Sequence, residues 1–418
     1  MAAGLSLEII PRFVREQAVT TPYPEQPGER DHWIIARRVG RNPLDPFKPH
    51  AFLLEEERAE SGEIVSVATI FLTNRECPWR CLMCDLWKNT LAETVRAGAI
   101  PAQIDHALAR LVAADVSPRR ASTGSCRVLT NAATRQIKLY NSGSFFDPRA
   151  IPPEDHEAIA RRVAVFERVI VECHPALVGE PALRFRDLVE EARAWDGKPP
   201  SVLNVSMGSG TALTPALSLR RGRIGASAQP LTPFPVEPCP AKAGADGLGT
   251  KLELAMGLET AHPEVLEKLN KRMTLDQFRR AAEFLRRNGI ALRVFVLVRP
   301  PFLHEVEALD WAGRSVDFAF DCGATVVSLV PTRFGNGALE ELAGRGQFSP
   351  PKLPTLEAAL EYGIGLKRGR VFVDLWDLEK FSDCPACVEQ RRRRLHEMNL
   401  RQMVLRRVIC ERCGGRIR

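Results

Sequence analysis

The chain has 418 residues, of which 45% are hydrophobic and 26% charged, and its formal net charge is +7; this length accommodates one large domain with a small appendage. No apolar run approaches the roughly 20 residues of a membrane span, and the N-terminus lacks a signal-peptide core, so the composition predicts a cytoplasmic protein with no membrane partner. Seven of the eleven cysteines fall in metal-ligand spacings, which excludes a secreted disulfide scaffold.

The first sixty residues differ in composition from the rest of the chain. Residues 1–50 are rich in proline and arginine and show little apolar periodicity, apart from a short stretch at Trp33–Ala36. We expect residues 1–60 to wrap the outside of a core that spans residues 61–380, and a basic, cysteine-rich segment at residues 381–418 to follow that core.

Apolar segments alternate with amphipathic helices through the core. The predicted strands cover residues 65–72, 136–140, 168–172, 251–257, 292–298, 325–330 and 371–375. The predicted helices begin at residue 101 and cover residues 153–166, 183–195, 263–269, 275–287, 306–320 and 356–366. This alternation predicts an α/β fold, an open (β/α)6 partial TIM-type barrel with helices outside a parallel sheet, whose ligands bind at the carboxyl ends of the strands.

Two segments interrupt the alternation. Residues 201–250 contain seven glycines and six prolines without an apolar period, and residues 113–135 are similar but shorter. Both contain a pair of arginines near serines, in SPRRASTGS and LSLRRGRIGAS. We interpret both segments as low-complexity inserts that carry no chemistry.

Three cysteines follow the first predicted strand of the core. Cys77, Cys81 and Cys84 are spaced C-x3-C-x2-C within IFLTNRECPWRCLMCDLW. Three thiolates hold three irons of a [4Fe-4S] cluster and leave the fourth iron open for a substrate that binds through nitrogen and oxygen. The alternative is zinc, but structural zinc takes four ligands, usually from two C-x2-C pairs. The triplet therefore predicts an iron–sulfur cluster with one open iron.

This spacing after a strand resembles the radical S-adenosylmethionine (SAM) superfamily, in which SAM chelates the open iron. Many members carry an aromatic residue before the third cysteine, where this chain has Met83. The resemblance implies that SAM lies across the strand ends, where five residues are candidate SAM contacts: Ser142, Gly143, Glu172, Gly257 and Glu259. The alternatives are a plain turn at the first two residues and, for either glutamate, an ion pair with a barrel arginine such as Arg299.

Longer strings narrow the resemblance to one family. FLTNRECPWRCLMCDLWKNT, YNSGSFFDP, IVECHPALV, LAMGLETAHPEVLEKLNKRMT and VRPPFLHE together resemble the radical SAM subunit of archaeosine synthase (RaSEA), which is grouped with the elongator catalytic subunit and tRNA methylthiotransferases. The resemblance implies a lyase-type reaction, in which a radical cleaves a C–N bond in a lysine adduct on a 7-deazaguanine base of tRNA. It also implies a flavodoxin- or ferredoxin-type reductant and a partner base-lysine transferase.

The C-terminal segment carries four further cysteines and the surplus of positive charge. Cys384, Cys387, Cys410 and Cys413 form two C-x2-C pairs, which fit zinc, with a second iron–sulfur cluster or unligated thiols as alternatives. Residues 388–418 contain ten arginines and three glutamates, so 10 − 3 = +7 equals the net charge of the whole chain. We expect an arginine-rich helix at residues 391–402 to contact phosphates, with a merely solvated helix face as the alternative.

Two other functions remain open at this point. One is a radical SAM enzyme of the same fold that acts on a small metabolite or a protein side chain. The other is a non-catalytic nucleic-acid-binding protein in which all seven clustered cysteines bind zinc. Anaerobic reconstitution separates the second from both enzymes, because only an iron–sulfur protein turns brown and bleaches with dithionite.

Overall fold

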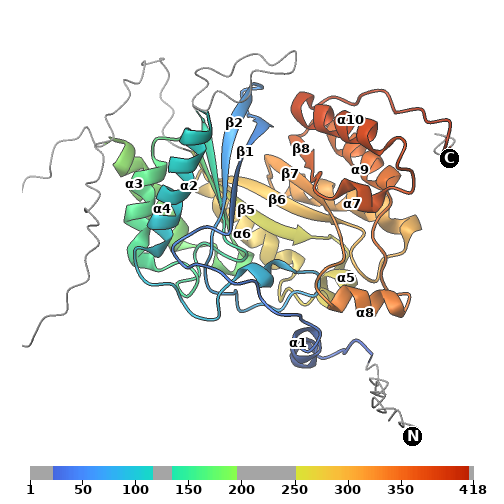
Figure 1. The fold of residues 1–418 in the computed structure, drawn as a ribbon, viewed down its shortest axis with the longest axis horizontal. Helices are drawn as coiled ribbons and strands as arrows, with labels where there is room; N and C mark the ends of the chain where they lie inside the picture. Colours follow the sequence, from blue (N-terminus) through green and yellow to red (C-terminus); the bar gives the residue numbers. More distant parts are fainter. Residues whose placement is uncertain (1–21, 116–133, 195–250, 414–418) are drawn as a thin grey trace, which may run out of the picture.

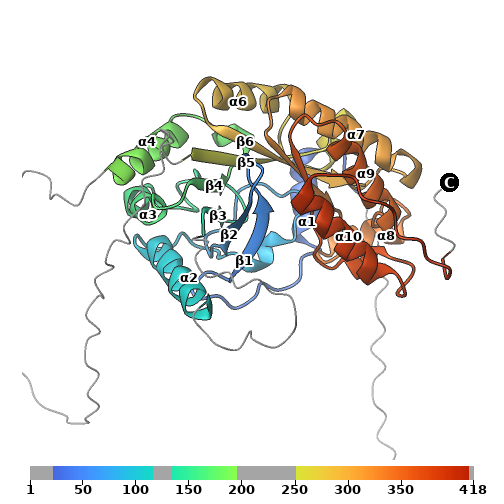
Figure 2. The same cartoon turned by 90° about the horizontal axis from the view of Figure 1, so that it is seen from above.

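The computed structural model describes residues 22–115, 134–194 and 251–413. These residues form one eight-stranded sheet, in which the strands neighbour one another in chain order from β1 to β8. The sheet curls into an open half-barrel, and helices form an arc around its outer face (Figure 1 and Figure 2). The predicted open α/β barrel is therefore confirmed, and most of the two predicted inserts lies outside the described residues.

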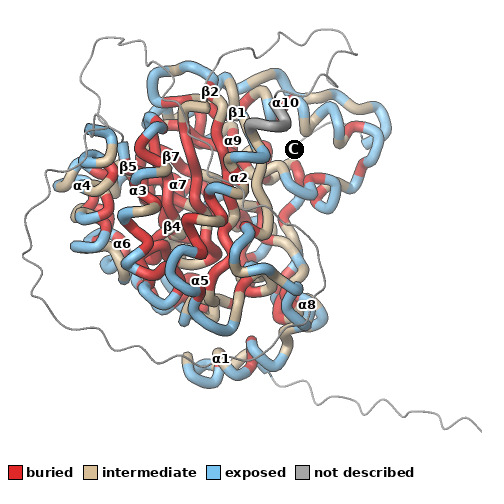
Figure 3. The backbone as a smooth tube through the Cα atoms, turned by 60° about the vertical axis from the view of Figure 1, so that its left-hand side comes forward, coloured by how far each residue is buried: buried red, intermediate tan, exposed pale blue. Residues whose placement is uncertain are grey.

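Seven strands of the sheet pair in parallel and lie within two residues of the predicted ones. Their outward side chains, such as Ile70, Leu139 and Val171, are completely buried, because the helices cover that face. Figure 3 shows this concentration of buried residues in the strands. The parallel strands are β2 (Ile64–Phe71), β3 (Gln136–Tyr140), β4 (Arg168–Glu172), β5 (Lys251–Glu259), β6 (Ala291–Val298), β7 (Val326–Pro331) and β8 (Arg370–Val373).

Ten α-helices are present in the described part of the chain. Two short ones, α1 and α8, were not predicted. None of the described helices is long and apolar enough to cross a membrane. The helices are α1 (Pro27–Ile35), α2 (Ala99–Asp115), α3 (His156–Val163), α4 (Glu180–Ala194), α5 (Pro263–Lys268), α6 (Leu275–Arg287), α7 (Glu305–Asp321), α8 (Ala338–Gly344), α9 (Leu353–Gly365) and α10 (Val388–Arg401).

The first strand of the sheet, β1 (Ala51–Arg58), was missed from the sequence. It pairs antiparallel with β2, so Ala51 lies beside Phe71 at the carboxyl end of that strand. Three consecutive glutamates in AFLLEEER hide the strand pattern, since isolated charges are costly inside a barrel. In this barrel Glu55 and Glu57 are not isolated, because both carboxylates pair with the ammonium group of Lys138 on β3.

Buried ion pairs fill the amino-terminal part of the barrel interior. Lys138 lies 2.6 Å from Glu57, Arg293 lies 2.6 Å from Glu253, and Arg168 lies 3.0 Å from the same Glu253. Burial alone would raise the pKa of Glu57, but Arg293 and Lys138 outweigh it and lower that pKa. This charged floor leaves the carboxyl end of the strands as the place where a ligand can enter.

The C-terminal helix α10 covers the open seam of the half-barrel, because it packs against both β1 and β8. Two amide side chains bind the free edge of β8. Gln402 accepts from the backbone N–H of Val371 (2.7 Å) and donates to its carbonyl (2.8 Å). Asn399 accepts from the backbone N–H of Val373 (3.0 Å) and donates to the carbonyl of the same residue (2.9 Å). These amides satisfy edge groups that would otherwise invite pairing with another chain.

Candidate active site

The cysteine triplet lies on a loop, residues 72–91, that leaves the carboxyl end of β2; we call it the cysteine loop. Its backbone is held from two distant segments. Leu82 donates its N–H to the carbonyl of Leu269 (2.9 Å), and Asn336 donates to the carbonyls of Leu82 (2.7 Å) and Cys84 (3.3 Å). Because these bonds come from segments after β5 and β7, the barrel as a whole fixes the position of the thiols.

Helices α1 and α8 brace the same loop. Leu82, between the second and third cysteines, is completely buried in a cluster with Trp33 and Ile34 of α1 and Leu339 of α8. Both helices lie at the lower end of the molecule in Figure 1. The apolar stretch at Trp33–Ala36, which had no assigned role, therefore packs onto the candidate site.

The three thiols are suited to a cationic ligand. Burial raises the pKa of all three thiols, that of Cys81 to about 12 and that of Cys84 well above its usual range. Neighbouring cysteine thiolates raise the pKa of Cys81 and Cys84 further. Three buried thiolates are therefore unfavourable here unless irons balance their charge. The donor set fits an iron–sulfur cluster, and the assignment of these residues as ligands stays a prediction.

Gly143 lies directly against the first cysteine. A Cβ atom at this position would come within 2.8 Å of the Cys77 Cβ, closer than a side chain tolerates. The preceding Ser142 has a left-handed φ of 55°. Glu172, at the end of β4, accepts a hydrogen bond from the backbone N–H of Asn141 (2.8 Å), and burial raises the pKa of its carboxyl to about 7. Glu172 thereby positions the backbone that runs past the cysteine; whether these residues contact SAM stays a prediction.

Gly257 leaves room for a buried ion pair. A Cβ atom here would collide with the carboxylate of Glu259 and the ammonium of Lys271, which form a salt bridge with each other. The alternative reading of Glu259 as one half of an ion pair thus has a counterpart in the structure, with Lys271 as the partner, whereas Arg299, the arginine named as an example, pairs with Glu305 at 2.5 Å. Burial would lower the pKa of Lys271, but Glu259 and two of the cysteine thiols raise it.

Lys271 is a site residue that sequence reasoning missed. It lies 12 positions after Glu259 in the chain, in the segment that follows α5; this segment belongs to the LAMGLETAHPEVLEKLNKRMT string, but no role was assigned to Lys271. Its retained positive charge can offset thiolate charge at Cys77 and Cys81.

A stacked ring pair joins the cysteine loop to the segment that follows β4. The rings of Trp79 and His174 lie 3.7 Å apart with an interplanar angle of 12°. His174 Nδ1 accepts from the N–H of Ala176 (3.2 Å), so its Nε2 donates to the carbonyl of Lys271 (3.1 Å). This neutral histidine connects three segments of the site.

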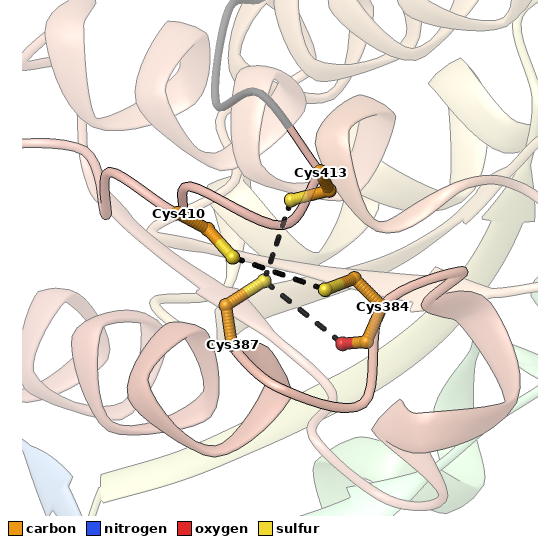
Figure 4. Close-up of side chains that lie close together, drawn as sticks. All are labelled: Cys384, Cys387, Cys410 and Cys413. Carbon is orange, nitrogen blue, oxygen red and sulfur yellow. Dashed lines mark hydrogen bonds between the residues drawn. The ribbon is translucent and has the colours of Figure 1, made fainter.

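The four C-terminal cysteines form a compact centre away from the triplet in sequence (Figure 4). The sulfurs of Cys384 and Cys410 lie 3.9 Å apart and those of Cys387 and Cys413 3.8 Å apart, and all four lie within 4.8 Å of one another. Tetrahedral Zn–S bonds of about 2.3 Å require S···S separations of about 3.8 Å. A four-iron cluster places each thiolate on a different iron, farther apart. The geometry therefore favours one tetrahedral ion.

The arginine row of α10 is only partly available to phosphates. Arg394 is 5% exposed and lies 2.6 Å from Glu361, and Arg391 Nε lies 3.0 Å from Glu357. Arg392 pairs with Glu379, whereas the side chain of Arg393 is 78% exposed. Glu357 and Glu361 of α9 therefore occupy Arg391 and Arg394, and contact between this helix and phosphates stays a prediction.

No protein-family model matches the chain. In sequence it is similar to an uncharacterized protein of Methanocaldococcus jannaschii, with 21% identity over 78% of this chain and 70% of that protein. It is also similar to archaeosine synthase subunit beta of Methanosarcina acetivorans, with 26% identity over 52% of this chain and 47% of that protein. The subunit beta of Thermococcus kodakarensis is 33% identical over 28% of this chain and 35% of that protein. Distant homology to archaeosine synthase subunit beta is confirmed.

The chain thus spans about half or less of the length of these two archaeosine synthase subunits. Among solved structures, the archaeal Elp3 of Methanocaldococcus infernus matches with 12% identity and a TM-score of 0.41, over 72% of this chain and 59% of that one. Coproporphyrinogen III oxidase of Escherichia coli, described as a radical SAM enzyme, matches with 10% identity and a TM-score of 0.36, over 81% and 55%. The functional argument rests on the cysteine loop and the sequence relatives.

Proposed function

We propose that this chain is a radical SAM enzyme that modifies a base in tRNA. The observation that carries the proposal is the cysteine loop: three thiols spaced C-x3-C-x2-C at the carboxyl end of the first parallel strand, with the backbone of Gly143 against Cys77. The distant homology to archaeosine synthase subunit beta supports the same reading.

In this proposal Cys77, Cys81 and Cys84 hold a [4Fe-4S] cluster. When bound, the reduced cluster and SAM supply a 5′-deoxyadenosyl radical that takes hydrogen from the substrate. The residues of the chain position the backbone and supply charge around the cluster. Glu172 holds the backbone at Asn141 beside the cysteine loop, and Lys271 places a positive charge near the thiols. Ser142, Gly143, Glu172, Gly257 and Glu259 are the proposed SAM contacts.

The homology also favours a particular reaction, cleavage of a C–N bond in a lysine adduct on a 7-deazaguanine base of tRNA. That reaction needs a base-lysine transferase to make the adduct and a flavodoxin- or ferredoxin-type protein to deliver the electron. We assign zinc to the four C-terminal cysteines, because their sulfur separations suit a single tetrahedral ion.

Anaerobic reconstitution with iron and sulfide tests the cluster assignment. The wild-type protein should turn brown, absorb near about 400 nm through thiolate-to-iron charge transfer, and bleach with dithionite. Cys77→Ala, Cys81→Ala and Cys84→Ala should each lose this chromophore while keeping zinc.

The matched control is Cys384→Ser, which should lose zinc and keep the brown chromophore. A triplet variant that retains a full complement of cluster iron would refute the assignment.

A further inference from the structure

Four aromatic side chains run from the rim of the half-barrel into its interior; we call them the aromatic cluster. The ring of Trp376 lies 5.8 Å from that of Phe71, Phe71 lies 6.0 Å from Tyr140, and Tyr140 lies 6.0 Å from Phe295. Phe71, Tyr140 and Phe295 are each only partly buried, although they sit on strands of the sheet. These three residues therefore keep part of their surface accessible to solvent.

Trp376 is exposed but firmly placed. It follows β8, yet its ring meets Phe71 of β2, so it reaches across the seam of the open sheet. Its backbone N–H donates to Asp374 (2.9 Å), and Asp374 pairs with Arg333 at 2.5 Å. The side chain is nonetheless 56% exposed. A tryptophan that only sealed the seam would be buried, because burial of its ring is what would stabilise the closure.

Three exposed aromatic residues lie on segments at this end of the barrel. Among the described residues, Phe47, Phe334 and Trp376 are 48%, 43% and 56% exposed, and they lie just before β1, after β7 and after β8. Because β1 is antiparallel to its neighbour, all three segments lie at the carboxyl end of the parallel strands. Tyr362 on α9 is the fourth exposed aromatic residue of the described chain; it lies on the outer helix layer.

We propose that the aromatic cluster is the stacking site for the target base, with Trp376 at its rim. This inference rests on the proposed function and names how that site recognises its substrate. An enzyme that acts on a base must take the base out of the helical stack, and aromatic side chains then replace the lost stacking. The buried ion pairs of the barrel floor limit how deep the base goes, so it lies between the charged floor and the indole.

Tryptophan fluorescence and tRNA binding test the proposal. Free 7-deazaguanosine should quench the emission of the wild-type protein, the quenching should be absent in Trp376→Phe, and ribose 5-phosphate, which has no base, should not quench. The Kd for a tRNA that carries 7-deazaguanine should rise about tenfold in Trp376→Ala, the loss typical of one stacked base. Trp376→Phe should restore most of that affinity.

Tyr362→Ala is the matched control, since it removes an exposed ring from the outer layer and should leave the Kd unchanged. Equal Kd values for wild type and Trp376→Ala, or quenching that persists in Trp376→Phe, would overturn the stacking site. Failure of the proposed function is a separate result, namely a wild-type protein that loads no cluster or produces no 5′-deoxyadenosine.

Discussion

Single glycines decide how close the backbone comes to the thiols. We expect Gly143→Ala to lower the iron bound after anaerobic reconstitution several-fold, because its Cβ would lie 2.8 Å from the Cys77 Cβ and one of the two loops must move. Gly179→Ala is the matched control, since a Cβ there meets nothing within 4 Å. Iron per protein, measured for both variants, checks this expectation; equal iron content in Gly143→Ala and wild type would show that the two loops do not need this contact.

His156 gives the fold a predictable acid sensitivity. Its ring stacks on Phe145, its Nε2 is buried without a hydrogen-bond partner among the described residues, and burial lowers its pKa to about 4. Since the unfolded chain binds the proton below about pH 6.5 and the folded state only near pH 4, stability falls as the pH drops through this window.

The expected loss from this residue is about 2 kcal/mol between pH 7 and pH 5. Urea unfolding of wild type and His156→Phe at both pH values measures it, because the phenylalanine keeps a ring in the cluster and cannot be protonated. The variant should lose less stability than wild type over this interval. The same loss in both proteins would mean that His156 is not buried in its neutral form.

At the residue scale, the sequence alone singled out the three cysteines and Gly143, which the structure places against Cys77, because residue spacing and backbone freedom are local properties. Lys271 and Asn336 could not be found in this way. Their roles depend on a turn after α5 and a loop after β7 meeting the cysteine loop, and that meeting is set by the closure of the whole sheet.

Among the elements, α10 connects the C-terminal segment firmly to the barrel. Its arginines bind glutamates of α9, and its amides cover the edge of β8. We therefore expect Arg394→Ala to lower the free energy of unfolding by about 2 kcal/mol, since it removes a buried guanidinium that binds Glu361 and the carbonyl of Leu405, while Arg407 still pairs with Glu361.

Arg393→Ala, on the same helix but with a side chain that is 78% exposed, should change stability by less than about 0.5 kcal/mol. Denaturant unfolding of the two variants gives the comparison. If both arginines prove equally dispensable, the contact between α9 and α10 does not hold the C-terminal segment in place.

The parallel strands were predictable because their outward faces are continuously apolar. The long helices were predictable because they are amphipathic. Strand β1, which the sequence did not reveal, contains Glu57, whose partners lie on β3 and β6. A local pattern cannot show that such charges are neutralised, because the neutralising residues are 81 and 236 positions away in the chain.

For the whole molecule, the two ends of the half-barrel differ in the side chains that fill them. Ion pairs close the amino end, while the cysteine loop, its bracing helices and the aromatic cluster occupy the carboxyl end. The carboxyl end also carries buried charge, because Glu259 pairs with Lys271 and because Glu76, the residue before Cys77, pairs with Arg38 and Arg80.

The most direct test of the central claim is the production of 5′-deoxyadenosine from SAM by the anaerobically reconstituted protein with dithionite as reductant. The wild-type protein should form this product, and Cys77→Ala should form none, because one iron then lacks its thiolate. Absence of the product from a fully iron-loaded wild-type protein, or its formation by Cys77→Ala at the wild-type rate, would contradict the assignment of this chain as a radical SAM enzyme.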